Sequence, residues 1–496
     1  MPPPVPQPSH VRVAVVGAGF AGIGTAARLR ARGTDDVVVF ERAEAIGGVW
    51  RDNVYPGAAC DVESHLYHLR DAPHSDWSRW FAQQPEIHEY LERVVQEKDL
   101  ARHIALGTTV EQAVWDDDAA HWRIETDKGG WTADVLVGAV GALAEPRFPD
   151  IPGLGSFAGP VLHTARWDTD LELGDKRVAV VGTGASAIQL VPAIQPAVER
   201  LTVFMRTPPT LIPRRDRALS DRARQRLGRS WLRRGLRRAL YAAHEVQGVP
   251  FRNPKVAPLS ALLARRHLHA QVQDPALRER LTPGYRFGCK RILLSDDFYP
   301  AIQQPNVTLA GAAATVRPDA VVEADGTAHP TDVLVFATGF HVHDFPFIDR
   351  ITGRVGRLSE VWQGEPKAHV GTTVAGFPNL FVMQGPNTGL GHSSVLMMME
   401  AQIEHLVNAL DAMDRYGLAS VEPRPQAQDA FVAEVDALSE GTAWTSGCDS
   451  WYLGASGRNA AIWPGSVGAF RRRVAPFDPS DYVCRSARTA PEPVLT

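Results

Sequence analysis

Two glycine-rich loops carry the clearest chemical signal in this sequence. Residues 17–22 (Gly-Ala-Gly-Phe-Ala-Gly) follow the β-branched run 11–16, and residues 182–187 (Gly-Thr-Gly-Ala-Ser-Ala) follow a similar run at 176–181. Each loop leads into a segment of helical character, which is the strand–loop–helix context that a dinucleotide site requires. Glycine lets the backbone turn tightly and approach a pyrophosphate at the helix N-terminus. We therefore expect two dinucleotide sites.

The residue after the next strand distinguishes the two sites. The run 37–40 is followed by Glu41, whose carboxylate accepts a hydrogen bond from a ribose 2′-OH and repels a 2′-phosphate. The run 201–204 is followed by Arg206, whose guanidinium accommodates a 2′-phosphate. The first site is thus expected to bind FAD or NAD, and the second site NADPH.

Two further segments favour FAD at the first site. Residues 47–50 (Gly-Gly-Val-Trp) come soon after Glu41, where flavoproteins of the glutathione-reductase type bring backbone against the cofactor. Far downstream, residues 332–340 resemble the second FAD strand motif of the same superfamily. Both ends of the chain are therefore expected to build the FAD domain.

Composition and charge bound the remaining classes of function. The chain has 496 residues and a formal net charge of −4, which gives no overall basic field for nucleic acid. No apolar run approaches the roughly 20 residues that span a bilayer. Residues 1–10 have neither a charged start nor an apolar segment, so we expect a short disordered tail and no signal peptide.

The cysteines are widely spaced in the sequence. They form neither a Cys-x-x-Cys pair nor a metal-ligand cluster, so we expect no metal site and a reducing, cytoplasmic location. The same spacing counts against a dithiol-dependent flavin reductase. The four residues are Cys60, Cys289, Cys448 and Cys484.

A spaced motif lies between the two glycine-rich loops. Phe157, Gly159, His163, Trp167 and Asp168 follow the pattern Phe-x-Gly-x-x-x-His-x-x-x-Trp-Asp. This pattern resembles the fingerprint of type I Baeyer–Villiger monooxygenases, whereas flavin-containing monooxygenases usually carry an aromatic residue followed by Lys or Arg at its end. The resemblance extends over nearly the whole chain. We interpret the histidine as a hinge residue between domains and not as a proton carrier.

The resemblance implies roles for four residues. Asp61, in a segment that matches the family's flavin-side loop, corresponds to the Asp beside the flavin, and Arg291 to the Arg above it, so we predict that both are catalytic. Lys290 corresponds to the Lys that contacts the 2′-phosphate of NADP. Trp451 corresponds to the Trp at the nicotinamide ribose.

The other cofactor residues also follow from the resemblance. For FAD it implies Gly17, Gly19, Phe20, Gly22, Glu41, Arg42, Gly48, Val49, Trp50, Asp61, Tyr67, Val110 and Asn387. For NADP it implies Cys60, Gly182, Thr183, Gly184, Ala185, Ser186, Gln189, Arg206, Thr207, Lys290, Arg291 and Trp451.

The implied reaction explains why an arginine is needed. A C4a-peroxyflavin, kept deprotonated, would attack a ketone carbonyl and insert one oxygen of O2 to give an ester or lactone. A permanently charged guanidinium at Arg291 would stabilise the anionic oxygens, and a buried lysine would lose its proton more readily. Asp61 would orient Arg291, and bound NADP would shield the site from water.

Two other functions stay open at this point. The same cofactors support oxygenation of nitrogen or sulfur centres, in which Arg291 matters less to the chemical step. A non-oxygenating NADPH-flavin reductase or oxidase, or a nucleotide-regulated binding protein, is the alternative from another class. The set Asp61, Lys290, Arg291 and Trp451 weakens the binding protein, and the cysteine spacing weakens the reductase.

The expected architecture is α/β, with two nested Rossmann-like dinucleotide domains of the glutathione-reductase type. The FAD domain would comprise residues 11–150 and 331–496, the latter including the C-terminal active-site segment. The NADPH domain would comprise 151–330, with a helical insertion at about 213–275. Eleven arginines between Pro213 and Tyr241, interleaved with leucines, predict helices with one apolar face inward and a solvated basic face outward.

One loop departs from the family pattern. Residues 385–394 follow a strand-like run and resemble the loop that closes the flavin site, but they lack the Gly-Pro-x-Ser-Pro-Ser form of cyclohexanone-type members. The asparagine at position 387 resembles the residue found in flavin-containing monooxygenases that oxidise nitrogen and sulfur. His392 is interpreted as a local hydrogen-bonding residue. The substrate, the regio- and stereochemistry and the choice between monomer and homodimer therefore stay open.

Overall fold

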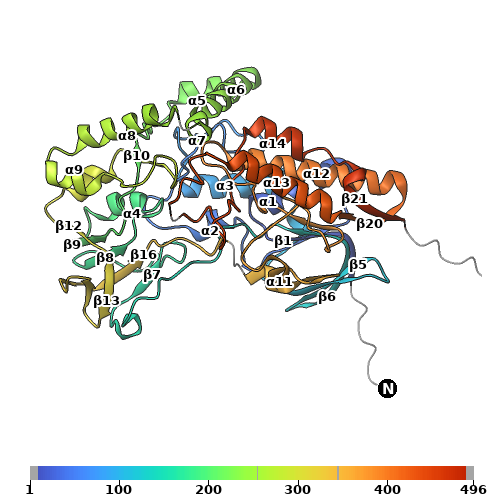
Figure 1. The fold of residues 1–496 in the computed structure, drawn as a ribbon, viewed down its shortest axis with the longest axis horizontal. Helices are drawn as coiled ribbons and strands as arrows, with labels where there is room; N and C mark the ends of the chain where they lie inside the picture. Colours follow the sequence, from blue (N-terminus) through green and yellow to red (C-terminus); the bar gives the residue numbers. More distant parts are fainter. Residues whose placement is uncertain (1–8, 254, 343–345, 449, 487–496) are drawn as a thin grey trace, which may run out of the picture.

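Two sheets built around parallel strands organise the chain. The computed structural model describes residues 9–253, 255–342, 346–448 and 450–486. Figure 1 shows the two sheets in opposite halves of the molecule, with the helices of the middle of the chain along one edge. Within the described residues, no helix is long and apolar enough to cross a membrane.

The larger sheet combines both ends of the chain. Its order is β18-β17-β4-β5-β6-β1-β2-β3, with β19 pairing parallel to β6. β1 pairs parallel to β2 and β6, and its apolar residues are covered on both faces, as a central strand requires. The strands are β1 (Ser9–Val16), β2 (Val37–Phe40), β3 (Ile104–Ala105), β4 (Val110–Asp116), β5 (His121–Thr126), β6 (Gly129–Gly138), β17 (Ile351–Gly353), β18 (Gly356–Arg357) and β19 (Leu380–Val382).

The second sheet comes mainly from the middle of the chain. Its order is β12-β9-β8-β16-β7 and every pairing in it is parallel. Its strands are β7 (Val161–His163), β8 (Arg177–Val181), β9 (Arg200–Phe204), β12 (Val307–Ala310) and β16 (Val333–Phe336). Smaller sheets comprise β10 (Leu211–Ile212) with β11 (Leu293–Leu294), β13 (Ala313–Arg317) with β14 (Ala320–Glu323) and β15 (Ala328–Pro330), and β20 (Leu418–Pro423) with β21 (Tyr482–Ser486).

A helix follows each of the two glycine-rich loops. α1 (Phe20–Arg32) packs against the long C-terminal helix α12 (Val395–Tyr416) and against α3 (Gln84–Glu97). In the second unit, α4 (Ala187–Ile194) packs against α10 (Phe298–Ile302). The remaining helices outside the insertion are α2 (Val49–Asp52), α11 (Leu358–Trp362), α13 (Pro425–Ser439) and α14 (Val467–Val474).

The arginine-rich insertion is helical, as its sequence predicts. It comprises α5 (Asp221–Leu227), α6 (Ser230–Gln247), α7 (Val249–Arg252), α8 (Ala257–Gln271) and α9 (Pro275–Leu281), of which α5, α6 and α8 lie along the upper edge in Figure 1. α6 buries Leu240 and His244 on its inner face, and Arg234 and Arg238 are exposed on the opposite face. Ser220 caps α5 by accepting a hydrogen bond from the backbone N–H of Ala223.

The sequence predicts the main strands correctly. The runs at 11–16, 37–40, 176–181 and 201–204 coincide with β1, β2, β8 and β9 to within two residues at each end. The predicted tail is wrong at its end, because Ser9 and His10 pair with β6 through Trp131 and Thr132. Residues 1–8 of that tail lie outside the described residues.

Candidate active site

The glycine-rich loops adopt backbone geometry that only glycine fits. Gly17 has φ +106°, and a Cβ there would lie 2.6 Å from the carbonyl oxygen of Ala139. A Cβ on Gly22 would lie 1.8 Å from the carbonyl oxygen of Gly17, and one on Gly182 (φ +115°) would lie 2.5 Å from that of Ala337. Both loops therefore fit a dinucleotide pyrophosphate whose phosphates approach bare backbone.

The carboxylate at the end of β2 organises the first loop. Glu41 is buried and accepts hydrogen bonds from the backbone N–H groups of Ala18 (2.9 Å) and Ala43 (3.0 Å). Arg51, which the sequence did not single out, donates to Glu41 at 2.9 Å. The backbone oxygen of Glu41 accepts from Thr108, two residues before Val110. The predicted FAD residues Glu41 and Val110 thus lie close to the first glycine-rich loop.

Three predicted FAD residues form an aromatic contact. The ring of Tyr67 lies edge-on to Phe20 (5.3 Å) and to Trp50 (5.7 Å), and the indole N–H of Trp50 donates to the Tyr67 hydroxyl at 3.1 Å. Burial of Tyr67 raises its pKa well above the ordinary value. A Cβ built on Gly48 would lie 3.1 Å from the Cα of Gly19, so the 47–50 segment approaches the first loop closely.

The second loop gathers positive charge near the end of β9. Arg206 is exposed immediately after β9, and the hydroxyl of Thr183 donates to the backbone oxygen of Thr207 at 3.0 Å. Lys290 lies 5.4 Å from the ring centroid of Tyr285, whose hydroxyl donates to the backbone oxygen of Pro208. Arg206 thus lies just past β9, and Lys290 lies beside Tyr285, which contacts the segment that follows β9.

Glutamine 189 connects the two units. Gln189 lies on α4, three residues past the predicted NADP residue Ser186. Its amide donates to the backbone oxygen of Ala59 at 3.0 Å. The hydroxyl of Tyr55 donates to its side-chain oxygen at 2.9 Å. The loop that carries Cys60 and Asp61 is thereby fixed against the second unit.

Asp61 and Arg291 form an ion pair where the two units meet. Their side chains are 2.5 Å apart and are each about one-third exposed. The charge of Asp61 raises the pKa of Arg291 above its ordinary value against the opposing effect of burial. Burial opposes ionisation of Asp61, but Arg291 and Arg214 outweigh it, so the pKa of Asp61 is lowered. Both groups are ionised at neutral pH.

Sequence reasoning missed the role of Arg214. Its guanidinium donates to the backbone oxygen of Cys60 at 2.9 Å and lies 5.2 Å from the centroid of the Phe81 ring. The residue adds a second positive charge beside Asp61. The sequence did not predict this contact, because Arg214 begins an arginine-rich segment whose pattern is typical of a solvated surface.

A buried ion pair fixes the insertion against the same loop. Nε2 of His244 on α6 lies 2.6 Å from the carboxylate of Glu63, and its Nδ1 lies 2.5 Å from the backbone oxygen of His392. Burial lowers the pKa of His244, but the Glu63 carboxylate outweighs it and the pKa is raised. The insertion is thus connected to the segment that holds Asp61.

The C-terminal candidates lie in different surroundings. Asn387 is buried, and its amide nitrogen donates to the backbone oxygens of Asn459 (2.7 Å) and Ile462 (3.4 Å), so it fixes the C-terminal loop. Trp451 is 44% exposed and contacts the ring of the buried Tyr452 at 4.4 Å. The predicted contacts of Asn387 with FAD and of Trp451 with NADP stay predictions.

The spaced motif lies where the two sheets connect. A Cβ on Gly159 would lie 2.1 Å from the backbone oxygen of Asp332, so only glycine fits beside β16. His163 is buried at the end of β7, accepts a hydrogen bond from the N–H of Ala165, and has a pKa lowered to about 4 by burial. Asp168 accepts from the backbone of Asp170. This geometry supports a structural role for the histidine.

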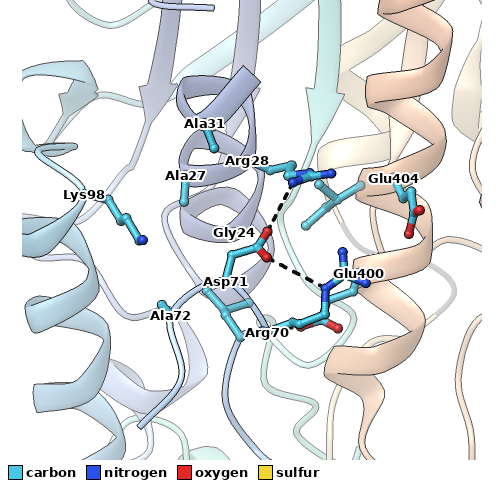
Figure 2. A pocket seen from close by; sticks show the side chains of 12 residues that line it. Gly24, Ala27, Arg28, Ala31, Arg70, Asp71, Ala72, Lys98, Glu400 and Glu404 are labelled. Carbon is cyan, nitrogen blue, oxygen red and sulfur yellow. Dashed lines mark hydrogen bonds and ion pairs between the residues drawn. The ribbon is translucent and has the colours of Figure 1, made fainter. Parts of the chain in front are cut away.

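Cavities lie between the first unit and the spaced motif, and within the first unit itself. One, of about 370 Å³, is lined by the predicted FAD residue Arg42, by Arg51 and Arg166, and by Trp167 of the motif. The other, shown in Figure 2, lies between α1 and α12 and is lined by Arg28, Asp71 and Glu400 among others. In its lining Arg28 pairs with Asp71, and Glu400 accepts a hydrogen bond from the backbone N–H of Arg70. The lining contains none of the predicted cofactor residues, so we assign this cavity no ligand.

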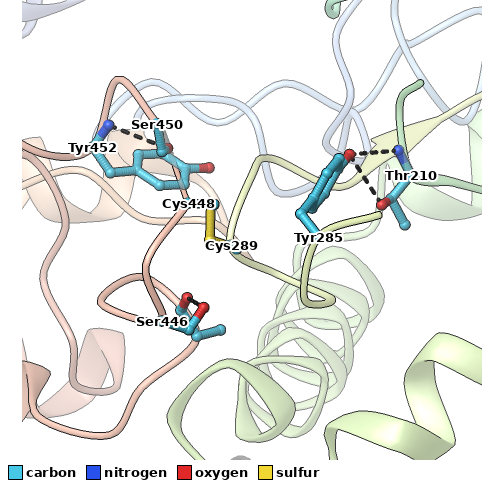
Figure 3. Close-up of a disulfide and its surroundings, with 8 residues drawn as sticks. Thr210, Tyr285, Cys289, Ser446, Cys448, Ser450 and Tyr452 are labelled. Carbon is cyan, nitrogen blue, oxygen red and sulfur yellow. Dashed lines mark hydrogen bonds between the residues drawn. A yellow bond between two sulfur atoms is a disulfide. The ribbon is translucent and has the colours of Figure 1, made fainter. Parts of the chain in front are cut away.

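The cysteines correct an expectation. Cys289 and Cys448, which are 159 positions apart, form a disulfide with their Cα atoms 6.3 Å apart (Figure 3). The wide spacing in the sequence did not predict this pair, because only the fold brings the two loops together. Cys60 and Cys484 are free thiols. Among the described residues, no group of three or more potential ligands is placed to hold a metal ion.

The fold and the site define a protein with two dinucleotide-binding units, and similar proteins identify its family. A family profile described as pyridine nucleotide-disulphide oxidoreductase matches residues 14–256. A Baeyer–Villiger monooxygenase of Streptomyces coelicolor is 48% identical over 482 residues, which cover 95% of this chain and 92% of that protein. Another, of Pseudomonas aeruginosa, is 42% identical over 481 residues, with 95% and 91% covered.

A solved structure agrees over the same length. Cyclohexanone monooxygenase from Rhodococcus sp. Phi1 bound to NADP+ matches with a TM-score of 0.86 and 31% identity, covering 97% of this chain and 100% of that one. The chain belongs to the Baeyer–Villiger monooxygenase family. It is an NADPH-dependent flavin monooxygenase with FAD as its second cofactor.

Proposed function

We propose that the Asp61–Arg291 pair is the catalytic centre and that the substrates are a small-molecule ketone and O2. The observation that carries this proposal is the 2.5 Å ion pair at the junction of the two dinucleotide units. Bound FAD, reduced by NADPH, supplies the activation of oxygen. The products are then an ester or lactone and water.

Arg291 acts through a charge that does not depend on pH. A guanidinium fixed in a partly dry site stabilises negative charge on oxygen as it develops, and it needs no reorganisation at that moment. Asp61 accepts a hydrogen bond from Nη2 of Arg291 and fixes the direction of the guanidinium. The same carboxylate balances the arginine charge before the reaction begins, so the site holds a neutral pair in the resting enzyme.

Positively charged residues after β9 support the proposal that the second unit binds NADPH. Arg206 lies just past β9, and Lys290 lies beside Tyr285, which contacts Pro208 in the segment that follows. The 2′-phosphate of NADPH would extend beyond the glycine-rich loop toward this segment. Charge-assisted hydrogen bonds to phosphate are among the stronger polar contacts in proteins. We propose that these two residues select NADPH over NADH. Gln189 and Cys60 would then border the nicotinamide end, because they lie where the two units touch.

Oxygenation of nitrogen or sulfur is the second candidate. Its support was the resemblance of Asn387 to flavin-containing monooxygenases. The Asn387 amide donates to the backbone oxygens of Asn459 and Ile462. This contact is compatible with ketone oxygenation and with heteroatom oxygenation. The Trp167-Asp168 ending of the motif and the family of the relatives favour the ketone.

A product analysis separates these functions. The holoenzyme would be incubated with NADPH, O2 and, in separate reactions, cyclohexanone, a dialkyl sulfide or a tertiary amine. We expect lactone in proportion to NADPH consumed. Sulfoxide or N-oxide without lactone would transfer the assignment to heteroatom oxygenation. Hydrogen peroxide alone with every compound tested would indicate an oxidase.

We also propose a cytoplasmic location, where NADPH is regenerated. Measurement of the enzyme in fractionated cells of its source tests this directly. Recovery with a cytoplasmic marker is the expected result, and recovery in a secreted or envelope fraction would overturn it.

A further inference from the structure

A covalent bond joins two loops that carry predicted active-site residues. Cys289 directly precedes Lys290 and Arg291, and Cys448 lies three residues before Trp451. Figure 3 shows the disulfide between the segment that also carries Tyr285 and the one that carries Tyr452. Because the loops come from positions 159 residues apart, the bond fixes the arginine loop of the second unit to the C-terminal part of the first.

Non-covalent contacts hold the same two segments together. Gly288 has φ +84°, and a Cβ there would lie 2.9 Å from the ring of Phe251 and 3.1 Å from the Cβ of Ala443. The N–H of Ala443 donates to the backbone oxygen of Phe251 at 2.9 Å, and the Phe251 ring stacks on Trp444. Opening the disulfide would therefore loosen the junction without removing it.

The two sulfurs differ in accessibility. Cys289 is fully buried and Cys448 is partly exposed, so an external thiolate reaches the sulfur of Cys448 first. That attack forms a mixed disulfide, breaks the bond to Cys289, and releases Cys289 as a thiolate beside Lys290 and Arg291 in the chain. A second external thiol then frees Cys448. In total, two external thiols become one disulfide, and the protein disulfide becomes two thiols.

We propose that Cys289–Cys448 is a redox-modification site whose thiol–disulfide state controls how firmly Arg291 is held in the oxygenating site. Disulfides that form in a reducing compartment are usually transient and catalytic or redox-sensing, and the proposed cytoplasmic location places this one there. With the bond closed, the arginine loop and the segment before Trp451 move together. With it open, the arginine charge is held less firmly, so more NADPH is consumed to make hydrogen peroxide instead of product. This inference rests on the proposed function for its activity readout, and on the proposed cytoplasmic location for its redox setting.

A titration of the full-length holoenzyme with glutathione at set ratios of reduced to oxidised form tests the proposal. Because Cys60 and Cys289 are buried, thiols would be labelled after the redox reaction is quenched and the protein unfolded, and the labelled peptides identified by mass spectrometry. At the oxidised end we expect label on Cys60 and Cys484 alone, and at the reduced end on all four cysteines. The hydrogen peroxide released per NADPH should rise several-fold across the same transition.

Two variants and one control give the site-specific test. Cys289→Ser and Cys448→Ser should each behave like the reduced enzyme and stop responding to glutathione. Cys484→Ser, which lies outside the pair on β21, should respond like the wild type. If a variant fails to fold, the titration of the wild type still tests whether peroxide yield follows the state of the disulfide.

Either of two results would overturn the proposal. One is labelling of both Cys289 and Cys448 at every glutathione ratio. The other is an unchanged peroxide yield while the bond opens and closes. Failure of the proposed function would look different, because no ester would form in either redox state while the thiol labelling still switched.

Discussion

In the proposed mechanism, the charge of Arg291 stabilises the negative charge that develops on oxygen. The nearby Asp61 carboxylate raises its pKa and burial opposes this only in part, so the side chain is cationic at any pH where the fold survives. The lowered pKa of Asp61 lies below the ordinary value of about 4 for a carboxyl. The pair therefore stays ionised as pH rises from about 5 to 9, and it gives the reaction no pH switch of its own.

Replacing the arginine tests its role in oxygen transfer. In Arg291→Ala we expect ester formation to fall by roughly 10²–10³, as when a fixed charge donor is lost from other sites. Reduction of FAD by NADPH should persist, which the loss of flavin absorbance under anaerobic conditions measures. Arg291→Lys is the control that keeps a charge, and it should lose less activity. Wild-type ester formation in the alanine variant would refute the role.

We propose that the choice of NADPH over NADH depends on a second set of charges. In Arg206→Ala we expect the Kd for NADPH to rise about tenfold, which is about 1.4 kcal/mol, because one charged contact to the 2′-phosphate is lost. The Kd for NADH should hardly change. Arg200→Ala is the matched control, since Arg200 is exposed at the opposite end of the same strand. Equal weakening of both nucleotides in Arg206→Ala would argue against a 2′-phosphate contact.

At the scale of elements, the inner face of α6 connects the insertion to the catalytic loop. Because the Glu63 carboxylate raises the folded-state pKa of His244, the pair stabilises the fold fully below the unfolded pKa of about 6.5. That stabilisation is lost as pH rises through the higher folded-state pKa. Stability should thus decline from pH 6 toward alkaline pH.

His244→Gln isolates this contribution. The glutamine keeps a hydrogen bond to Glu63 but no charge, so we expect about 1.5–3 kcal/mol less stability at about pH 6 and little difference from wild type at alkaline pH. Urea unfolding at several pH values, with bound FAD held constant, measures both effects. An equal loss at every pH would show that the pair contributes through packing and not through charge.

The local sequence pattern predicts much of the fold but fewer of the contacts in the candidate active site. The strands before both loops, and the glycines within them, follow from β-branched runs and from turns that exclude a Cβ. The pairing of Asp61 with Arg291 followed from family resemblance alone. Contacts such as His244–Glu63 and Cys289–Cys448 join positions 181 and 159 residues apart, and nothing local distinguishes these residues from their neighbours.

At the scale of the whole molecule, the spaced motif lies at the chain junction between the two sheets. Gly159 lies at this junction, against the backbone of Asp332. In Gly159→Ala the added Cβ would displace β7 from β16, and we expect a loss of about 2–4 kcal/mol. Thermal unfolding measures this. Gly155→Ala is the control, because a Cβ there meets open space. Equal stability of the two variants would contradict the close packing.

The most direct test of the account is isotope incorporation. The holoenzyme would be supplied with NADPH, a cyclic ketone and ¹⁸O₂, and the product analysed by mass spectrometry beside Arg291→Ala. The account predicts one ¹⁸O atom in a lactone, formed with NADPH and nearly absent from the variant. Unlabelled product, labelled product at wild-type rate in the variant, or hydrogen peroxide without lactone for every ketone tried would contradict it.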